Sequence, residues 1–141
     1  MQSEYNLERF VKAQQDDYEN ALAEVRNGRK RSHWMWYVFP QVEGLGFSET
    51  SRFYAIKNLD EAGAYLHHPV LGPRLVEICR ALLSLSNNNA GDIFGSPDDM
   101  KLRSSMTLFA AVESADEVFT LVLKKFFKGL KDDKTLRLLR L

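Results

Sequence analysis

The chain has 141 residues, of which 45% are hydrophobic and 27% charged, and its 19 basic side chains balance 19 acidic ones. This composition indicates one globular domain and excludes a disordered chain. The longest apolar run, 34–39, has six residues, far short of the ~20 that cross a bilayer. We therefore expect no membrane span and no secretory signal. A single Cys excludes an internal disulfide and a multi-cysteine zinc site, which favours the cytoplasm.

Charge is distributed unevenly along the chain. Residues 1–25 carry six acids and two bases, whereas residues 124–141 carry seven bases and two acids. Nucleic-acid-binding domains usually have a basic balance with aromatic residues among the bases. One local basic cluster precedes the two Trp residues: Arg26, Arg29, Lys30 and Arg31. Because the whole chain is neutral, we expect no nucleic-acid partner and interpret the charge blocks as solvated helix faces.

The first predicted element is a helix over residues 7–25, with Asn6 as its cap and Gly28 just past its end. Apolar residues recur in it at spacings of three and four, with acids on the other face. The next apolar segment, 34–39, has the aromatic and β-branched content of a strand. We predict a helix, because no second run of comparable strand propensity exists to pair with it. Pro40 ends this element in either case.

Four further helix starts carry capping residues. They are Ser48, Asn58 with Glu61, Ser96 with Pro97 and Asp99, and Ser114 with Glu117. Residues 69–86 place a stripe of Leu, Ile and Cys side chains on one face, which predicts the central helix. Residues 87–91 contain three consecutive Asn and predict a turn. A helix before Gly129 and a short one over 136–139 close the chain. The sequence therefore predicts an all-α single domain, residues 1–141, with about seven or eight helices and no significant sheet.

The most unusual segment is 32–41, which places four aromatic residues and a His within ten positions. Two interpretations stay open. Trp34, Trp36 and their neighbours pack in the core, with indole N–H groups bonded to carbonyls. Alternatively they form a pocket wall, to which His33 and Gln41 add directional hydrogen bonds.

A glycine-containing turn follows this segment. Gly44, Gly46 and Ser48 precede a helix start, and this pattern suits an anion because glycines let the backbone approach a ligand closely. The pattern is neither a dinucleotide fingerprint nor a P-loop, and a plain turn is the alternative.

Other polar residues offer weaker candidates. His67 and His68 follow a helix, where capping of its last carbonyls is the simpler interpretation. Their spacing does not suit a metal, so we predict no metal site and no cofactor. Cys79 falls on the apolar stripe of its helix and is expected to be buried and inert. Lys101, Ser104 and Ser105 share one helix face, where the serines either allow close helix packing or line a polar cavity.

Several separate motifs occur in the order found in one known family. They are His33 to Gln41, Gly44 to Gly46, Tyr54 to Ile56, Glu61 to Leu66, His68-Pro69, Leu71-Gly72, Arg74-Leu75, and Asp99 to Phe109. Through these motifs, over residues 6–140, the chain resembles the bacterial domain-of-unknown-function family 1810. The resemblance implies a compact all-α domain and no established activity. Some members carry a calpastatin label, which does not fit here because calpastatins are largely disordered.

The resemblance also groups polar positions that composition alone does not associate: His33, Gln41, His68, Arg74, Lys101, Ser104 and Ser105. We expect them to converge on a pocket for an anionic, nucleotide-like molecule. Trp34 and Trp36 would form its walls, Arg74 and Lys101 its cations, and Gly44, Gly46 and Ser48 its backbone donors. The catalytic candidates are His33, His68, Ser104 and Ser105. The alternative is a protein-interaction module without catalysis, in which the aromatic residues form a homodimer or partner interface.

Overall fold

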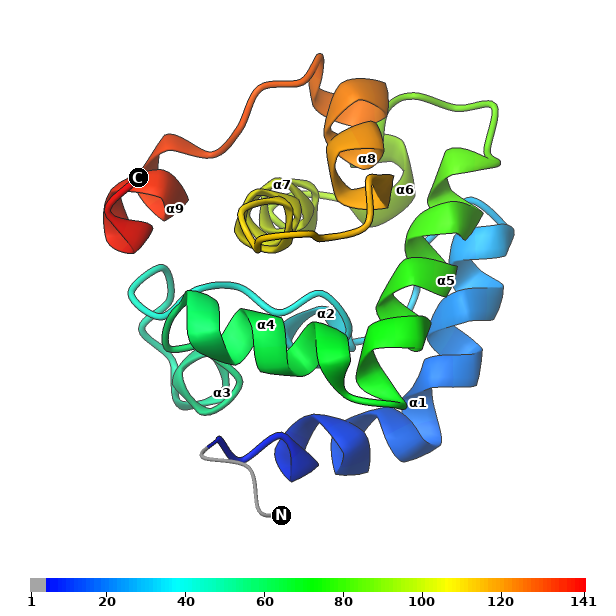
Figure 1. Ribbon diagram of the computed structural model, residues 1–141. Helices are drawn as coiled ribbons and strands as arrows, with labels where there is room; N and C mark the ends of the chain where they lie inside the picture. Colours follow the sequence, from blue (N-terminus) through cyan, green and yellow to red (C-terminus); the bar gives the residue numbers. More distant parts are fainter. Residues whose placement is uncertain (1–4) are drawn as a thin grey trace.

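The computed structural model describes residues 5–141, which form nine helices (Figure 1). Within this range the only β-pairing is an isolated parallel bridge between Val42 and Ile56. No helix there is both long enough and apolar enough to cross a bilayer. The all-α prediction is therefore confirmed. The helices are α1 (Glu8–Arg26), α2 (Met35–Val38), α3 (Glu49–Phe53), α4 (Leu59–His67), α5 (Leu71–Leu83), α6 (Ala90–Phe94), α7 (Asp98–Ala110), α8 (Val118–Phe127) and α9 (Asp133–Leu139).

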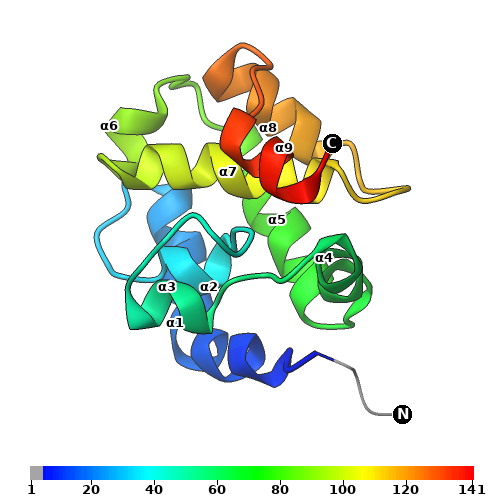
Figure 2. The ribbon, with the colours of Figure 1, turned by 90° about the vertical axis from the view of Figure 1, so that its left-hand side faces the viewer.

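Helix α7 is the most enclosed element. Figures 1 and 2 show it between α8 and α9 on one side and α2, α3 and α4 on the other. Six consecutive residues, 104–109, are buried, so the C-terminal half of the helix is covered on every side. The prediction that residues 69–86 form the central helix is wrong, because α5 keeps an exposed face while it packs on α1, α4 and α8. Hydrophobic periodicity pointed to α5 because an apolar stripe on one helix face is easy to recognise in a sequence. A helix such as α7 that is buried on several faces has no such stripe.

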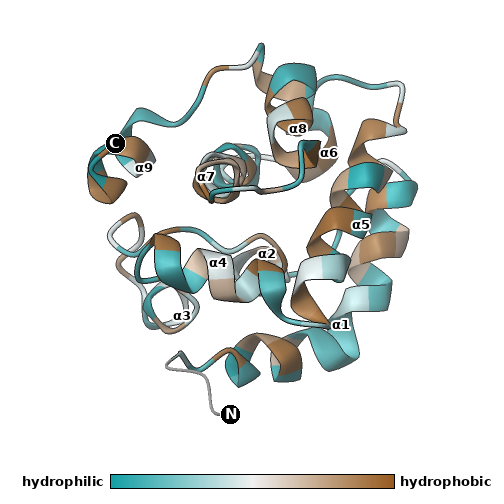
Figure 3. Cartoon of the chain, in the orientation of Figure 1, coloured by the Kyte–Doolittle hydropathy of each residue, from teal (hydrophilic) through white to brown (hydrophobic). Residues whose placement is uncertain are grey.

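Helices α1 and α5 have the amphipathic pattern that the sequence predicted. Hydrophobic and hydrophilic residues alternate along both (Figure 3), and their apolar faces pack against each other. The buried face of α5 consists of Leu71, Leu75, Ile78, Cys79 and Leu82. Burial raises the pKa of the Cys79 thiol above its usual range, as expected of an unreactive cysteine.

The predicted helix boundaries are partly confirmed. Asn58 and Ser48 cap α4 and α3 by accepting bonds from the backbone N–H groups of Glu61 and Ser51. Gly28 and Gly129 follow α1 and α8 with positive φ angles. Three predicted caps are wrong: the side chains of Asn6, Ser96 and Ser114 do not cap α1, α7 and α8. The Asn-rich segment is not only a turn, because Asn89 caps a short helix, α6.

The turn between α4 and α5 depends on Gly72. A Cβ atom at this position would lie 2.0 Å from the carbonyl oxygen of Leu66, which is backbone and cannot move away cheaply. Gly63, in the middle of α4, has far more room: a Cβ there would meet only a Val112 methyl group at 3.8 Å. Gly63 therefore serves as the control for a substitution at Gly72.

We expect Gly72→Ala to lower the free energy of unfolding by at least ~2 kcal/mol, because the helices must separate to admit the methyl group. Gly63→Ala should leave stability unchanged or raise it by up to ~1 kcal/mol, since Ala is the better helix former. Urea denaturation followed by circular dichroism measures both. Equal effects of the two substitutions would contradict the close approach of α5 to α4.

Candidate functional site

A small, partly open cavity lies at the loop that follows α2. It has a volume of about 20 Å³ and is lined by Trp36, Gln41, Gly44, Gly46 and Arg52 among others. This volume accommodates one water-sized group. Gln41 is 8% exposed, and its Nε2 atom has no hydrogen-bond partner within residues 5–141. A buried amide without a partner costs about 1–3 kcal/mol, which marks Gln41 as a candidate ligand contact.

Four of the predicted site residues meet at this cavity because the backbone folds tightly around it. Gly44 has a φ of +107°, in the region that favours glycine. Gly46 lies so close to Ser51 that a Cβ atom would approach the Ser51 Cβ to 2.5 Å, and the Trp36 ring lies next to the same position. The loop is held at its base by backbone bonds between residues 41–43 and Ile56.

The Trp36 ring connects this cavity to a cluster of charges on α7. The Nζ atom of Lys101 lies 4.0 Å from the ring centroid, a distance typical of a cation–π contact. Asp98 accepts from Lys101 at 3.0 Å and from Lys30 at 2.9 Å. Burial opposes ionisation of Asp98, but the two ammonium groups outweigh it and lower its pKa. The three side chains together keep one positive charge next to Trp36.

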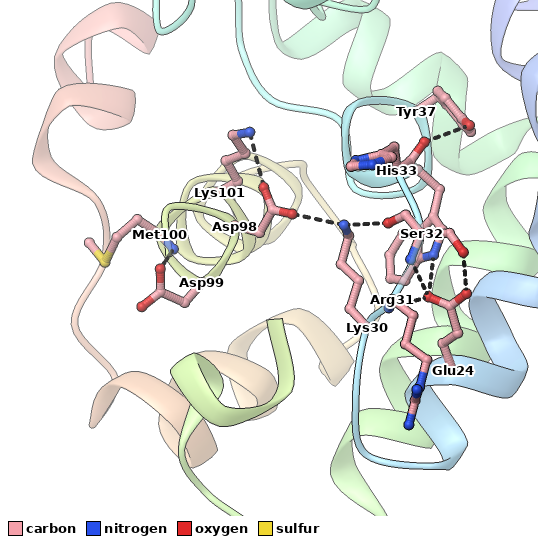
Figure 4. Close-up of polar contacts among 11 residues, drawn as sticks. Glu24, Lys30, Arg31, Ser32, His33, Tyr37, Asp98, Asp99, Met100 and Lys101 are labelled. Atoms are coloured by element: carbon pink, nitrogen blue, oxygen red, sulfur yellow. Dashed lines mark hydrogen bonds and ion pairs between the residues drawn. The ribbon is translucent and has the colours of Figure 1, made fainter. Parts of the chain in front are cut away.

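Lys30 joins the start of α7 to the segment that precedes α2 (Figure 4). Its side chain is 8% exposed, and besides Asp98 it donates to the carbonyl oxygen of Ser32 at 2.5 Å. The same ammonium lies 5.1 Å from the Trp34 ring. Lys30 belongs to the basic cluster of the sequence, but only the fold shows that it is buried and shared with α7.

Glu24, on α1, holds this segment in place. Its carboxylate accepts from the backbone N–H groups of Arg31 and Ser32 at 2.6 and 2.9 Å, and from the Ser32 hydroxyl at 2.6 Å. The Trp34 indole donates at 3.0 Å and Asn20 at 2.8 Å. Burial raises the pKa of Glu24, but these donors outweigh it and lower the pKa to about 2. Glu24 therefore stabilises the folded chain as an anion.

We expect Glu24→Gln to lower stability by about 3 kcal/mol at pH 7, because an amide cannot accept all these bonds. The Glu24 pKa is depressed in the folded state, so its contribution is complete above about pH 4.5 and is lost as the pH falls through about 2. Urea denaturation between pH 7 and pH 2.5 should show the gap between wild type and variant narrowing with acid. Glu19→Gln, an exposed position on α1, is the control and should change little. A gap that stays constant with pH would refute the role of the charge.

The two Trp residues differ in what they can contact. Trp34 is 1% exposed and lies in the core with Phe39 and Phe94. Its predicted role as a pocket wall is therefore wrong, because a ligand cannot reach its ring. Trp36 is half-buried and available at the cavity. His33 precedes them and is exposed at the start of α2, near Lys30 in Figure 4.

Arg74 and His68 do not join this site. Arg74 reaches from α5 to α1, where its guanidinium lies 5.0 Å from the Tyr18 ring and 3.5 Å from the Gln14 amide oxygen. His68 caps the start of α5: its Nδ1 atom accepts from the N–H groups of Val70 and Leu71 at 3.1 and 3.3 Å. The predicted residues therefore do not converge on a single pocket. Arg74 and His68 have structural partners that the sequence motif does not reveal.

The three serines have different surroundings. Ser48 uses its hydroxyl to cap α3. Ser104 donates to the carbonyl oxygen of Met100 at 3.2 Å, an ordinary bond within a helix. Ser105 is fully buried, and its hydroxyl has no partner within the described range. It follows Lys101 by one helical turn, so it lies on the α7 face that carries Lys101.

Arg52 is the functional candidate that sequence reasoning missed. It lies on α3, lines the Gln41 cavity, and its guanidinium has no hydrogen bond or ion pair to residues 5–141. A guanidinium binds carboxylate or phosphate in a bidentate way. Its only sequence signal was its place four residues after the capping Ser48. Residues 5–141 contain no cluster of three or more His, Cys, Asp or Glu side chains suited to a metal.

A larger hollow lies elsewhere. It is a groove of about 800 Å³ along α5, and its lining residues include Val76, Val112, Phe119 and the ion pair of Arg80 with Asp116. No predicted ligand-binding residue lines it, and no side chain there is a buried polar group without a partner. The groove therefore offers area for contact, but it has no unsatisfied buried polar group that would require a particular ligand.

Comparison with known proteins places the chain in a family. A family model described as a protein of unknown function (DUF1810) matches residues 4–139, and the chain belongs to this family. Among solved structures it is similar to the crystal structure of the conserved hypothetical protein Rv1873 from Mycobacterium tuberculosis. The two chains share 46% identity over 99% of each, with a TM-score of 0.96. No curated protein matches the chain.

Proposed function

We propose that this protein binds a small molecule through an oxyanion group, a carboxylate or a phosphate, at the cavity beneath the loop 41–46. The observation that carries the proposal is the unpartnered amide of Gln41, a residue that lines a cavity with room for one oxygen atom. A ligand oxygen entering the cavity would accept this bond. A group of this size leaves the rest of the ligand outside, over the loop.

The charges around the cavity support an anion. Arg52 is one of the residues that line it and is exposed, with a guanidinium that makes no hydrogen bond or ion pair to residues 5–141. Lys101 lies against the Trp36 wall, and Asp98 is shared between two lysines. Cations placed next to a buried donor favour a carboxylate or phosphate over a neutral carbonyl. His33 is exposed on the adjoining segment and is the candidate proton donor or acceptor. We further propose a cytoplasmic location, supported by the single unpaired Cys79.

A thermal-shift screen with phosphate, citrate, sugar phosphates and nucleoside monophosphates tests the proposal. A ligand at ~100 times its dissociation constant adds ~2.7 kcal/mol to the folded state. The shift should disappear in Arg52→Ala and persist in Arg74→Ala, a matched control whose guanidinium packs on Tyr18 instead. Absence of a shift with every anion, or its loss only in Arg74→Ala, would refute the proposed site.

Gln41→Met gives a second, independent prediction. Met has a similar length and no donor, so it removes the unsatisfied amide and should raise the stability of the free protein by about 1 kcal/mol. The same substitution should remove the anion-dependent shift, because the ligand oxygen loses its donor. Urea denaturation and the thermal-shift assay measure the two effects. A variant that is less stable than wild type yet keeps the anion response would show that Gln41 serves packing alone.

An interaction module is the second candidate, favoured by the groove of about 800 Å³ along α5. Static light scattering at increasing concentration distinguishes it from a monomeric ligand-binding domain. A mass that stays at 16.2 kDa argues against self-association through this groove.

A further inference from the structure

The loop that covers the cavity carries a strongly exposed aromatic residue. Phe47 directly follows Gly46, a cavity-lining residue, and is 77% exposed, more than any other large hydrophobic side chain in residues 5–141. A ring exposed to this degree buries little apolar surface and so contributes little to the stability of the fold. Its position, one residue from the cavity wall, places an accessible ring where the outer part of a bound ligand would lie.

The basic C-terminal segment reaches the same loop through α9. The Lys134 ammonium lies 6.0 Å from the Phe47 ring centroid. Leu138, one turn further along α9, packs on Gly44, where a Cβ atom would approach its methyl carbon to 3.0 Å. An extended arm leads from α8 to α9 (Figure 1), and α9 packs against α7. Arg103 fixes this arm by donating to the carbonyl oxygens of Leu130 and Lys131 at 2.9 and 2.8 Å.

Two aromatic rings with cations beside them therefore flank the glycine loop: Trp36 with Lys101 on the cavity side and Phe47 with Lys134 on the outer side. The outer ring is exposed and the inner ring is half-buried. A ligand that fills both positions needs an anionic group for the cavity and a planar ring for Phe47. Lys134 adds a positive charge next to the same loop.

We propose that the ligand is a phosphate monoester that carries a planar ring, the chemistry of a nucleoside monophosphate, and that Phe47 stacks on this ring. This inference rests on the proposed function, since the phosphate takes the Gln41 and Arg52 site. Stacking on an aromatic side chain is tolerant of the identity of the base. Phe47 thus distinguishes ring-bearing phosphates from simple ones, while the cavity recognises the phosphate itself.

Isothermal titration with three probes tests the inference: AMP, ribose 5-phosphate and inorganic phosphate. We expect wild type to bind AMP at least tenfold more tightly than ribose 5-phosphate. Phe47→Ala should weaken AMP binding about tenfold and leave ribose 5-phosphate binding unchanged. Phe53→Ala is the matched control, because Phe53 is also exposed, at 54%, but packs edge-on against Tyr54. It should bind all probes as wild type does.

The outcomes separate this inference from the proposed function. Equal binding of AMP and ribose 5-phosphate by wild type overturns the ring preference and leaves the anion site standing. A preference for AMP that survives in Phe47→Ala also overturns the inference, because the ring must then lie elsewhere. Failure of all three probes to bind, in a protein with a normal melting curve, refutes a phosphate site and the inference with it.

Discussion

The carboxylate of Glu24 is the interaction on which this architecture depends. It gathers five donors from residues 20–34 and so fixes the short connection between α1 and α2. From this connection Lys30 reaches Asp98 at the start of α7. One buried anion therefore links the first helix, the aromatic segment and the enclosed helix, and it sets the position of Trp36. A hydrophobic core alone would not give these elements a unique register.

The candidate site and the core share a single segment. In residues 34–39 two half-buried residues, Trp36 and Tyr37, lie between buried ones. Trp34 and Phe39 therefore complete the core, while Trp36 lines the cavity and contacts Lys101. This segment thus contributes residues both to the core and to the lining of the candidate site. Gln41 shows the cost of this division, because its buried amide is left without a partner where an apolar side chain would be cheaper. Such a position is expected at a site selected for binding rather than for stability.

Sequence reasoning succeeded where the signal was local. Asn58 with Glu61 and Ser48 were identified as caps because an N-cap bond spans three residues. It failed where a distant partner decided the outcome. Arg74 was placed in the site as a cation, but α1 supplies Tyr18 and Gln14 to receive it, 56 and 60 positions away along the chain. Arg52 was overlooked because nothing near it in the sequence shows that it lines a cavity with Gln41.

The sequence by itself determined the helical class, some of the helix boundaries and the unusual character of residues 32–48, because periodicity, capping and composition act over a few residues. The tertiary structure decided which of those residues are accessible together. Trp34 was buried and Trp36 left half-buried because side chains two positions apart point to different sides, and Asp98 holds Lys101 beside Trp36 together with Lys30. Contacts of this kind depend on how whole helices pack, and no spacing within one segment encodes that packing.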